Sequence, residues 1–364
     1  MKIVIDARES GTSTGRYIDK LIEYLHILQP AYDIVVVTKP QRVDFMRKIA
    51  PNFKVVKTPY KEFTFGEQLG FKRQLQRLKP DLVHFGMTQQ PVWYRGRVVT
   101  TIHDLTTLRF RNPAKNPLVY SIKQQIYKWV TKRVAQKSTR IIVPTEFVKH
   151  DVMQFTRLPA DKLIVTHESA DKITDKPVVF EAVATSKRFL LYVGRPQPHK
   201  NLERLIDAYS VVKQSQPSLQ LVLAGKFDAA YQKLKDYAKD GLVEDVIFTD
   251  WVSDGQLRWL YEQATAYVFP SLSEGFGLPG LEAMQYDLPV ISSNATCLPE
   301  VYGNAVVYFN PLNVQAMATA INQVLSDEGL RRGLAARGRQ QLTKYSWRRM
   351  AEQTLAVYDM TLKS

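Results

Sequence analysis

The sequence predicts an α/β protein of two domains, each built on a doubly wound parallel sheet. Short β-branched runs alternate with segments of helical periodicity along the chain, which is typical of strand–helix–strand units. The length of 364 residues suits two domains of ordinary size. The stretch 169–187 lacks this alternation and divides the pattern in two. We expect the two sheets to face each other across a cleft at the carboxyl ends of their strands.

In the first half, helices are expected to begin near Gly15, Gln41, Glu67 and Asn116, between strands that are short and apolar. The expected strands are 2–6, 33–38, 81–85, 98–103 and 140–144. In the second half, the expected strands are 189–194, 219–224, 246–249, 266–270, 289–292 and 305–309. Helices are expected at 201–214, 229–239, 253–263, 278–285 and 314–326. The domains would then span 1–170 and 171–345, with a last helix in 346–364 that packs back on the first domain.

The excess positive charge is confined to the first half of the chain. The formal net charge is +15, and residues 51–150 alone hold 19 basic and 5 acidic residues. The resulting positive electrostatic potential attracts an anionic partner, whether nucleic acid, anionic lipid or a phosphorylated substrate. A solvated basic surface without such a partner is the alternative. The only cysteine, Cys297, excludes an internal disulfide. With no apolar run long enough to span a bilayer, we expect a cytoplasmic protein.

The strongest motif follows the predicted strand 266–270 and opens a helix. It reads Ser273-Glu-Gly-Phe-Gly-Leu-Pro-Gly-Leu-Glu-Ala283. Its glycines permit a tight turn, and the amides at the start of the helix favour an anion. Glu274 lies on the loop and Glu282 about two turns along, so we expect them to address different parts of one ligand. The alternative is a capped helix with a surface glutamate.

Three other segments at predicted strand ends are candidates for binding or catalysis. In the first, Gly194 ends a strand, and Arg195 and Lys200 flank a proline-rich turn where two cations suit a diphosphate. In the second, His103 and Asp104 form a pair that could hold a hydroxyl or move a proton. The third is the Gly/Ser/Thr loop 11–17, which lacks the G-x-G-x-x-G spacing of a dinucleotide site. Turn-capping charges and a strand-end histidine are the structural alternatives.

Together these motifs resemble glycosyltransferase family 4, the retaining nucleotide-sugar transferases of GT-B fold. The resemblance rests on Glu274 and Glu282 with seven residues between them and on Val193-Gly-Arg195 followed by Lys200-Asn201. It extends to the segments 287–292, 297–301 and 345–347 and covers essentially the whole chain. In detail the chain is similar to bacterial mannosyltransferase-like members that build surface polysaccharide. The resemblance implies two Rossmann-like domains, a GDP- or UDP-linked sugar as substrate, no cofactor and no divalent metal.

The resemblance also implies a role for each matching residue. Glu274 would bind donor-sugar hydroxyls, Glu282 the ribose hydroxyls, and Arg195 and Lys200 the diphosphate. His103 would reach the transferred sugar. Further donor contacts would come from the backbone of a set of loop residues: Gly15, Gly194, Val252, Gly275, Phe276, Gly277 and Leu278. Asp250 departs from the family pattern, which has a small residue there, and this leaves the base undetermined between guanine and uracil.

We therefore expect a metal-independent hexosyltransferase that moves a hexose, mannose by preference, to a hydroxyl of a lipid-linked or oligosaccharide acceptor. Acceptor specificity is expected in the loops 59–70 and 89–94. The basic helix 118–137 suggests peripheral contact with the inner face of the membrane. The alternatives are a nucleic-acid or anionic-surface binding protein without catalysis, and a GT-B phosphorylase or sugar-nucleotide epimerase. No nucleic-acid motif supports the first alternative, so no nucleic-acid partner is expected.

Overall fold

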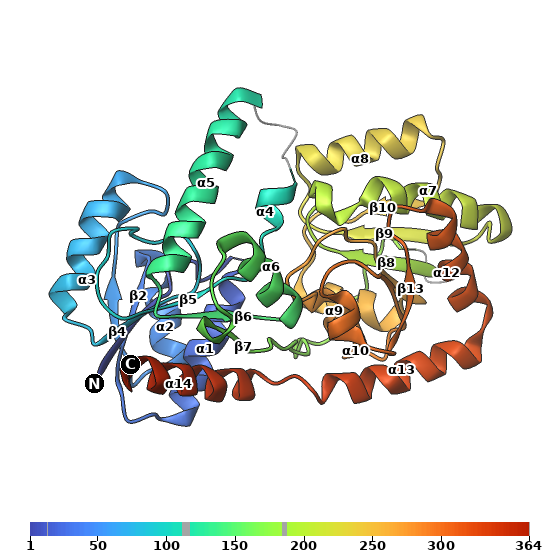
Figure 1. The fold of residues 1–364 in the computed structure, drawn as a ribbon. Coiled ribbons are helices and arrows are strands. Elements are labelled where there is room, and N and C mark those ends of the chain that lie inside the picture. The colour runs from blue at the N-terminus through green and yellow to red at the C-terminus, as the bar shows by residue number, and fades with distance from the viewer. Residues whose placement is uncertain (13, 111–116, 184–187, 364) are drawn as a thin grey trace. The chain divides into compact units, whose positions relative to one another are not determined.

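The computed structural model describes residues 1–12, 14–110, 117–183 and 188–363 and divides the chain into two compact units (Figure 1). Among the described residues, unit 1 comprises those within 1–109, 117–168 and 346–363, and unit 2 comprises residue 110 and those within 169–345. The helix start expected near Asn116 lies outside the described residues. Among the helices that the structure describes, no helix combines the length and apolarity needed to cross a bilayer.

Unit 1 is built on a seven-stranded parallel sheet in the order β3-β2-β1-β4-β5-β6-β7. Its strands are β1 (Lys2–Asp6), β2 (Asp33–Thr38), β3 (Lys54–Lys57), β4 (Leu82–Phe85), β5 (Val98–Thr101), β6 (Arg140–Val143) and β7 (Leu163–Val165). The inner strands are apolar and buried because helices cover both faces of a parallel sheet. The sequence pattern missed β3 and β7. Both are short edge strands, and edges are where apolar periodicity is weakest.

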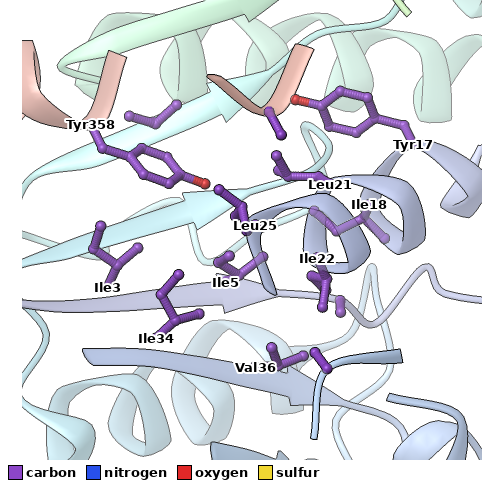
Figure 2. Packing of buried hydrophobic residues seen from close by; sticks show 14 of the residues in the cluster. Ile3, Ile5, Tyr17, Ile18, Leu21, Ile22, Leu25, Ile34, Val36 and Tyr358 are labelled. Atoms are coloured by element: carbon purple, nitrogen blue, oxygen red, sulfur yellow. The ribbon is translucent and has the colours of Figure 1, made fainter. Parts of the chain in front are cut away.

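The helices of unit 1 include the last helix of the chain. They are α1 (Gly15–Leu28), α2 (Val43–Ile49), α3 (Lys72–Leu78), α4 (Thr106–Arg109), α5 (Pro117–Lys137), α6 (Glu146–Thr156) and α14 (Trp347–Lys363), and a π-helical turn (Glu67–Phe71) precedes α3. Helices α1 and α14 pack beside each other on the sheet, and Figure 2 shows Leu25 and Tyr358 clustered with Ile3 of β1. The Tyr358 hydroxyl lies 2.6 Å from His84 Nδ1, so a polar contact also joins α14 to β4.

Unit 2 contains a six-stranded parallel sheet in the order β10-β9-β8-β11-β12-β13. The strands are β8 (Phe189–Val193), β9 (Gln220–Ala224), β10 (Val246–Phe248), β11 (Ala266–Phe269), β12 (Val290–Ser293) and β13 (Val306–Phe309). The helices are α7 (Leu202–Ser215), α8 (Ala229–Asp240), α9 (Asp254–Gln263), α10 (Leu278–Met284), α11 (Leu298–Tyr302), α12 (Val314–Ser326) and α13 (Glu328–Leu342). Each predicted strand of this half is present to within a residue or two at either end.

Strand order reverses once in each sheet, and these reversals define where a ligand can bind. In unit 1 the reversal lies between β1 and β4, and in unit 2 between β8 and β11. The connections that leave two adjacent strands at such a point go to opposite faces of the sheet and leave an open crevice at the carboxyl ends. In unit 2, the loops at this crevice are 194–201 and 270–277, which contain the two strongest sequence motifs.

Candidate active site

The two loops at the strand reversal of unit 2 are held against each other by backbone and side-chain hydrogen bonds. The Leu272 amide donates to the His199 carbonyl at 2.7 Å. The Asn201 side-chain amide donates to the carbonyls of Pro270 at 3.1 Å and Pro311 at 2.8 Å. Asn201 itself has φ of 60°, a left-handed conformation that asparagine tolerates better than most residues. The relative position of the two loops is therefore built into the fold.

Lys200 and Glu274, one from each of these loops, form an ion pair. The Lys200 ammonium donates to Glu274 Oε1 at 2.6 Å, and their side chains are 18% and 13% exposed. Lys200 Nζ also lies 5.6 Å from the centre of the Phe269 ring at the end of β11. The structure thus brings together two residues that the sequence places 74 positions apart. A cation and a carboxylate side by side can bind both the anionic and the hydroxyl-rich parts of a sugar phosphate.

Thr296 and Tyr302 hold the loop 274–277 in place through hydrogen bonds. The Glu274 amide donates to Thr296 Oγ1 at 3.1 Å. Gly277 has φ of 96°, and a Cβ at that position would come within 2.7 Å of the Tyr302 hydroxyl. That hydroxyl donates to the Gly277 carbonyl at 2.5 Å. The glycine is required both by conformation and by space, so the amides that follow it are fixed at the start of α10.

The other predicted donor residues of unit 2 lie on the same edge of the sheet or near it. Glu282 lies on α10 and accepts a hydrogen bond from the Tyr261 hydroxyl at 3.3 Å, which holds its carboxylate in place. Arg195 is exposed, and its carbonyl accepts from the Gln197 amide at 2.9 Å. Val252 follows β10 and is partly exposed. Gly194 follows β8, Gly275 and Phe276 follow Glu274, and Leu278 is the first residue of α10.

In unit 1, His103 pairs with Glu168, whereas the sequence motif suggested a pair with Asp104. His103 Nδ1 lies 2.9 Å from Glu168 Oε1, and Nε2 lies 3.1 Å from the Gly86 carbonyl. The Asp104 carboxylate instead accepts from the Thr106 amide. Burial opposes a charge on the imidazole, but the Glu168 carboxylate and the Gly86 carbonyl raise the pKa of His103 above its usual value. Because both ring nitrogens face acceptors, the protonated ring suits this position.

Sequence reasoning missed Glu168 because it stands beyond a three-residue strand that gave no periodic signal. Its position after the carboxyl end of β7 was the available clue. Gly15, the other candidate in unit 1, is the first residue of α1. A Cβ there would lie 1.8 Å from the Glu9 carbonyl, so the loop can turn back this closely only at a glycine.

Unit 1 also contains a buried charge network at the end of β1 that no motif indicated. The Arg8 guanidinium is 1% exposed. It donates to Asp6 Oδ2 at 2.7 Å, to Glu67 Oε1 at 2.8 Å and to the Gln89 carbonyl at 3.1 Å. The Phe71 ring lies 3.9 Å from the guanidinium carbon. These contacts fasten the loops around Glu67 and Gln89 to the sheet, since buried charges persist only when they are paired.

Comparison with known proteins agrees with this geometry. A family model described as glycosyltransferase family 4 matches residues 14–171, and one described as glycosyl transferases group 1 matches 177–341. The chain is 30% identical over 279 residues to the O-antigen chain mannosyltransferase B of Escherichia coli, a match that covers 72% of this chain and 70% of that protein. It is 30% identical over 282 residues to the serotype-specific mannosyltransferase WbdA of Escherichia coli, covering 74% of this chain but 34% of that longer protein.

Solved structures show the same fold at lower identity. Sucrose-phosphate synthase from Thermosynechococcus elongatus superposes with a TM-score of 0.78 at 19% identity, covering 99% of this chain and 98% of that one. Anabaena HepE in complex with UDP and glucose gives a TM-score of 0.75 at 16% identity, with 99% of each chain covered. Two parallel α/β units with this topology define a GT-B glycosyltransferase, which confirms the expected fold class. The chain belongs to glycosyltransferase family 4, as the sequence motifs indicated, and it is similar to mannosyltransferases of that family.

Proposed function

We propose that this glycosyltransferase is a retaining, metal-independent hexosyltransferase of surface glycan synthesis. It takes a hexose, mannose by preference, from a nucleoside diphosphate sugar and transfers it to a hydroxyl of a lipid-linked or oligosaccharide acceptor. The observation that carries the proposal is the Lys200–Glu274 ion pair at the strand reversal of unit 2. Mannose is favoured because the two Escherichia coli relatives are named mannosyltransferases. UDP and GDP both remain candidates for the donor's nucleotide, and the bound UDP of HepE supports the first.

Each residue then has a role that its position supports. Lys200 and Arg195 neutralise the diphosphate, where negative charge grows as the bond from the sugar's anomeric carbon to the phosphate oxygen breaks. Glu274 binds hydroxyls of the donor sugar and Glu282 those of the ribose. The acceptor hydroxyl attacks from the face that the diphosphate leaves, and its proton passes to the departing phosphate oxygen. His103 contacts the transferred sugar, held in orientation by Glu168.

Donor binding can be tested without knowing the acceptor. A panel of UDP-, GDP- and ADP-sugars is screened by thermal shift against the wild-type protein and Glu282→Ala. A ligand at about 100 times its dissociation constant stabilises the fold by about 2.7 kcal/mol. We expect one nucleotide class to raise the melting temperature of the wild type, and Glu282→Ala to weaken binding of the bare nucleoside diphosphate. If no sugar nucleotide shifts the wild type, the proposal is wrong.

Metal independence is tested by chelation. Fixed cations at Lys200 and Arg195 supply the positive charge that a divalent ion would otherwise bring to the diphosphate. We therefore expect EDTA to leave turnover largely unchanged. Complete loss of turnover on chelation, restored by added manganese, would contradict this part of the proposal.

We also propose that unit 1 associates peripherally with an anionic membrane surface on the cytoplasmic side. The basic residues Lys123, Lys132 and Arg133 are exposed along α5, and each such residue near an anionic leaflet contributes about 1 kcal/mol. Co-sedimentation with vesicles should require anionic lipid and weaken at high salt. Equal binding to neutral vesicles, or none to anionic vesicles at low salt, would favour a soluble acceptor.

A further inference from the structure

A large apolar cavity lies on unit 1, and the residues that line it include none that the sequence assigned to the donor. Its volume is about 920 Å³, and its walls come from the segments 63–68 and 89–93 and from helix α5. The volume lies in the range of ordinary small-molecule sites, roughly 300–1,000 Å³. The two loop segments fall within the stretches 59–70 and 89–94, in which acceptor specificity was expected.

The cavity walls are tied together by hydrogen bonds and by the buried Arg8 network. Gln68 joins the two loop segments, because its Oε1 accepts from the Val92 amide at 2.8 Å and its Nε2 donates to the Gln90 carbonyl at 3.3 Å. Glu67, which is paired with Arg8, accepts from the Phe63 amide at 3.1 Å. The cavity is therefore held together by the fold of unit 1.

Several large apolar side chains at the cavity face water. Phe65 is 89% exposed, Phe63 68% and Ile126 56%. Trp93 and Trp129 are each about half exposed, although their rings lie only 6.3 Å apart. Clustered exposure of this kind is unfavourable unless a ligand or a membrane covers it, since apolar surface in water costs about 25 cal/mol per Å².

Charge around the cavity is positive. Helix α5 contains five basic residues and no acidic residue, and its Lys123 lines the cavity, whereas burial lowers the pKa of Lys137 to about 7. Arg95 and Arg97 are exposed just beyond Trp93. The acidic residues of the first loop segment, Glu62 and Glu67, are paired with Lys39 and Arg8. An apolar cavity with a basic rim complements a molecule that has a hydrocarbon chain and an anionic head.

A glycan fits the cavity less well than a hydrocarbon chain does. Sugar rings stack on aromatic faces but also need hydrogen-bond donors and acceptors around them. Three of the four side-chain amides that line this cavity donate to the chain's own oxygen atoms: Gln68 to the Gln90 carbonyl, Gln90 to Thr100 Oγ1 and Gln124 to the Thr107 carbonyl. The buried side-chain oxygens of Gln90 and Gln124 remain as acceptors, but most of the rest of the lining is aromatic and aliphatic surface.

We propose that this cavity binds the hydrocarbon chain of a lipid phosphate acceptor, with the phosphate at the basic rim near Lys123. The inference rests on the proposed function, because it names the class of acceptor that the enzyme takes. The chain packs among Trp93, Trp129 and Ile126, and the sugar-bearing end extends beyond the rim.

Isothermal titration with farnesyl phosphate, kept below its aggregation concentration, tests the proposal. Wild-type protein should bind it at least 100-fold more tightly than inorganic phosphate. Ile126→Glu, which places a charge on the cavity wall, should weaken binding at least tenfold, or about 1.4 kcal/mol. The matched control is Ile27→Glu on α1, an isoleucine 51% exposed that does not line the cavity. It should bind farnesyl phosphate within twofold of the wild type, and the melting temperatures of both variants establish that they fold.

Three results would overturn the inference. The first is that the folded wild type does not bind farnesyl phosphate. The second is that Ile126→Glu and Ile27→Glu weaken farnesyl phosphate binding equally. The third is that the protein binds a mannose oligosaccharide and that Ile126→Glu abolishes this binding. The last would make the cavity a glycan site. Titration with GDP and UDP separates this failure from failure of the proposed function. Nucleotide binding should be the same in Ile126→Glu as in the wild type, and absence of nucleotide binding in every variant would instead reject the proposed function.

Discussion

The ion pair between Lys200 and Glu274 provides the sharpest test of the donor site. Lys200→Met removes the cation and keeps most of the apolar length of the side chain. The Glu274 carboxylate, 13% exposed, is then left without the ammonium that now donates to it at 2.6 Å. In the reaction, the leaving diphosphate loses a fixed positive charge at the point where negative charge develops.

The size of the effect follows from these contacts. Removing one preorganised donor from developing charge typically costs 10²- to 10³-fold in kcat, or about 2.7–4 kcal/mol. The cost in folding is smaller, about 1–3 kcal/mol for a carboxylate that loses its partner but keeps some contact with water. Because the two side chains touch, Lys200→Met and Glu274→Gln together should deviate from additivity by about 0.5–3 kcal/mol in a double-mutant cycle.

A second ion pair of the same length in unit 2 supplies the control. Lys213, in the last turn of α7, donates to Asp245 Oδ2, also at 2.6 Å. Both residues lie outside the donor loops 194–201 and 270–277. Lys213→Met should lower the melting temperature as Lys200→Met does, yet keep its turnover. Turnover is measured as release of nucleoside diphosphate at saturating donor. Near wild-type kcat in Lys200→Met, or equal losses in the two lysine variants, would refute the assigned role.

Three further predictions concern the supporting structure. Glu168→Gln should lower the pKa of His103. In the wild type, the stabilisation from this pair is complete below the usual histidine pKa and is lost as the pH rises through the raised pKa. The melting temperature of the variant should therefore depend less on pH across the neutral range. Gly277→Ala should destabilise the protein by about 1–3 kcal/mol, since its φ is 96° and a Cβ there has no room. Tyr358→Phe should leave His84 Nδ1 without its partner, cost about 1–3 kcal/mol and speed hydrogen exchange in α14.

Matched variants make these three results specific. Gly241→Ala lies at a glycine with φ of −78° and no atom nearer than 3.4 Å to the added Cβ, so it should change stability little. Asp104→Asn is the graded comparison for Glu168→Gln. The Asp104 charge also raises the pKa of His103 but ranks below the hydrogen bond and charge of Glu168, so Asp104→Asn should show the smaller pH effect. Burial lowers the pKa of His84 to about 3, so the Tyr358→Phe effect should not vary with pH near neutrality.

The buried strands and the donor loops could be predicted because their signals are local. A strand such as β8 is a run of apolar residues, and the motif from Glu274 to Glu282 combines glycines, a helix start and carboxylates within nine positions. The pairing of Lys200 with Glu274 was not predicted, although both residues were assigned to the donor; it follows from the adjacency of β8 and β11, which their loops leave. Sequence spacing is then irrelevant to which side chains meet.

The features that were missed depend on contacts between distant segments. Glu168 is joined to His103 across 65 positions, and Arg8 to Glu67 across 59. Neither pair has a local pattern, because an isolated charged residue in a sequence looks the same whether it is solvated or buried. The cavity beside α5 was also unpredictable in detail. Apolar residues repeat every four positions along that helix, from Ile122 to Val134, yet Val134 is buried and Ile126 is exposed.

The most direct test of the proposed function is the transfer reaction itself, which is monitored by NMR of the anomeric proton in donor and product. The enzyme is given the sugar nucleotide that stabilises it best, together with a prenyl phosphate-linked glycan as acceptor. We predict a glycoside with the donor's anomeric configuration, formed by the wild type and Lys213→Met and at least 100-fold more slowly by Lys200→Met. A product of inverted configuration, or equal rates in the wild type and Lys200→Met, would contradict it.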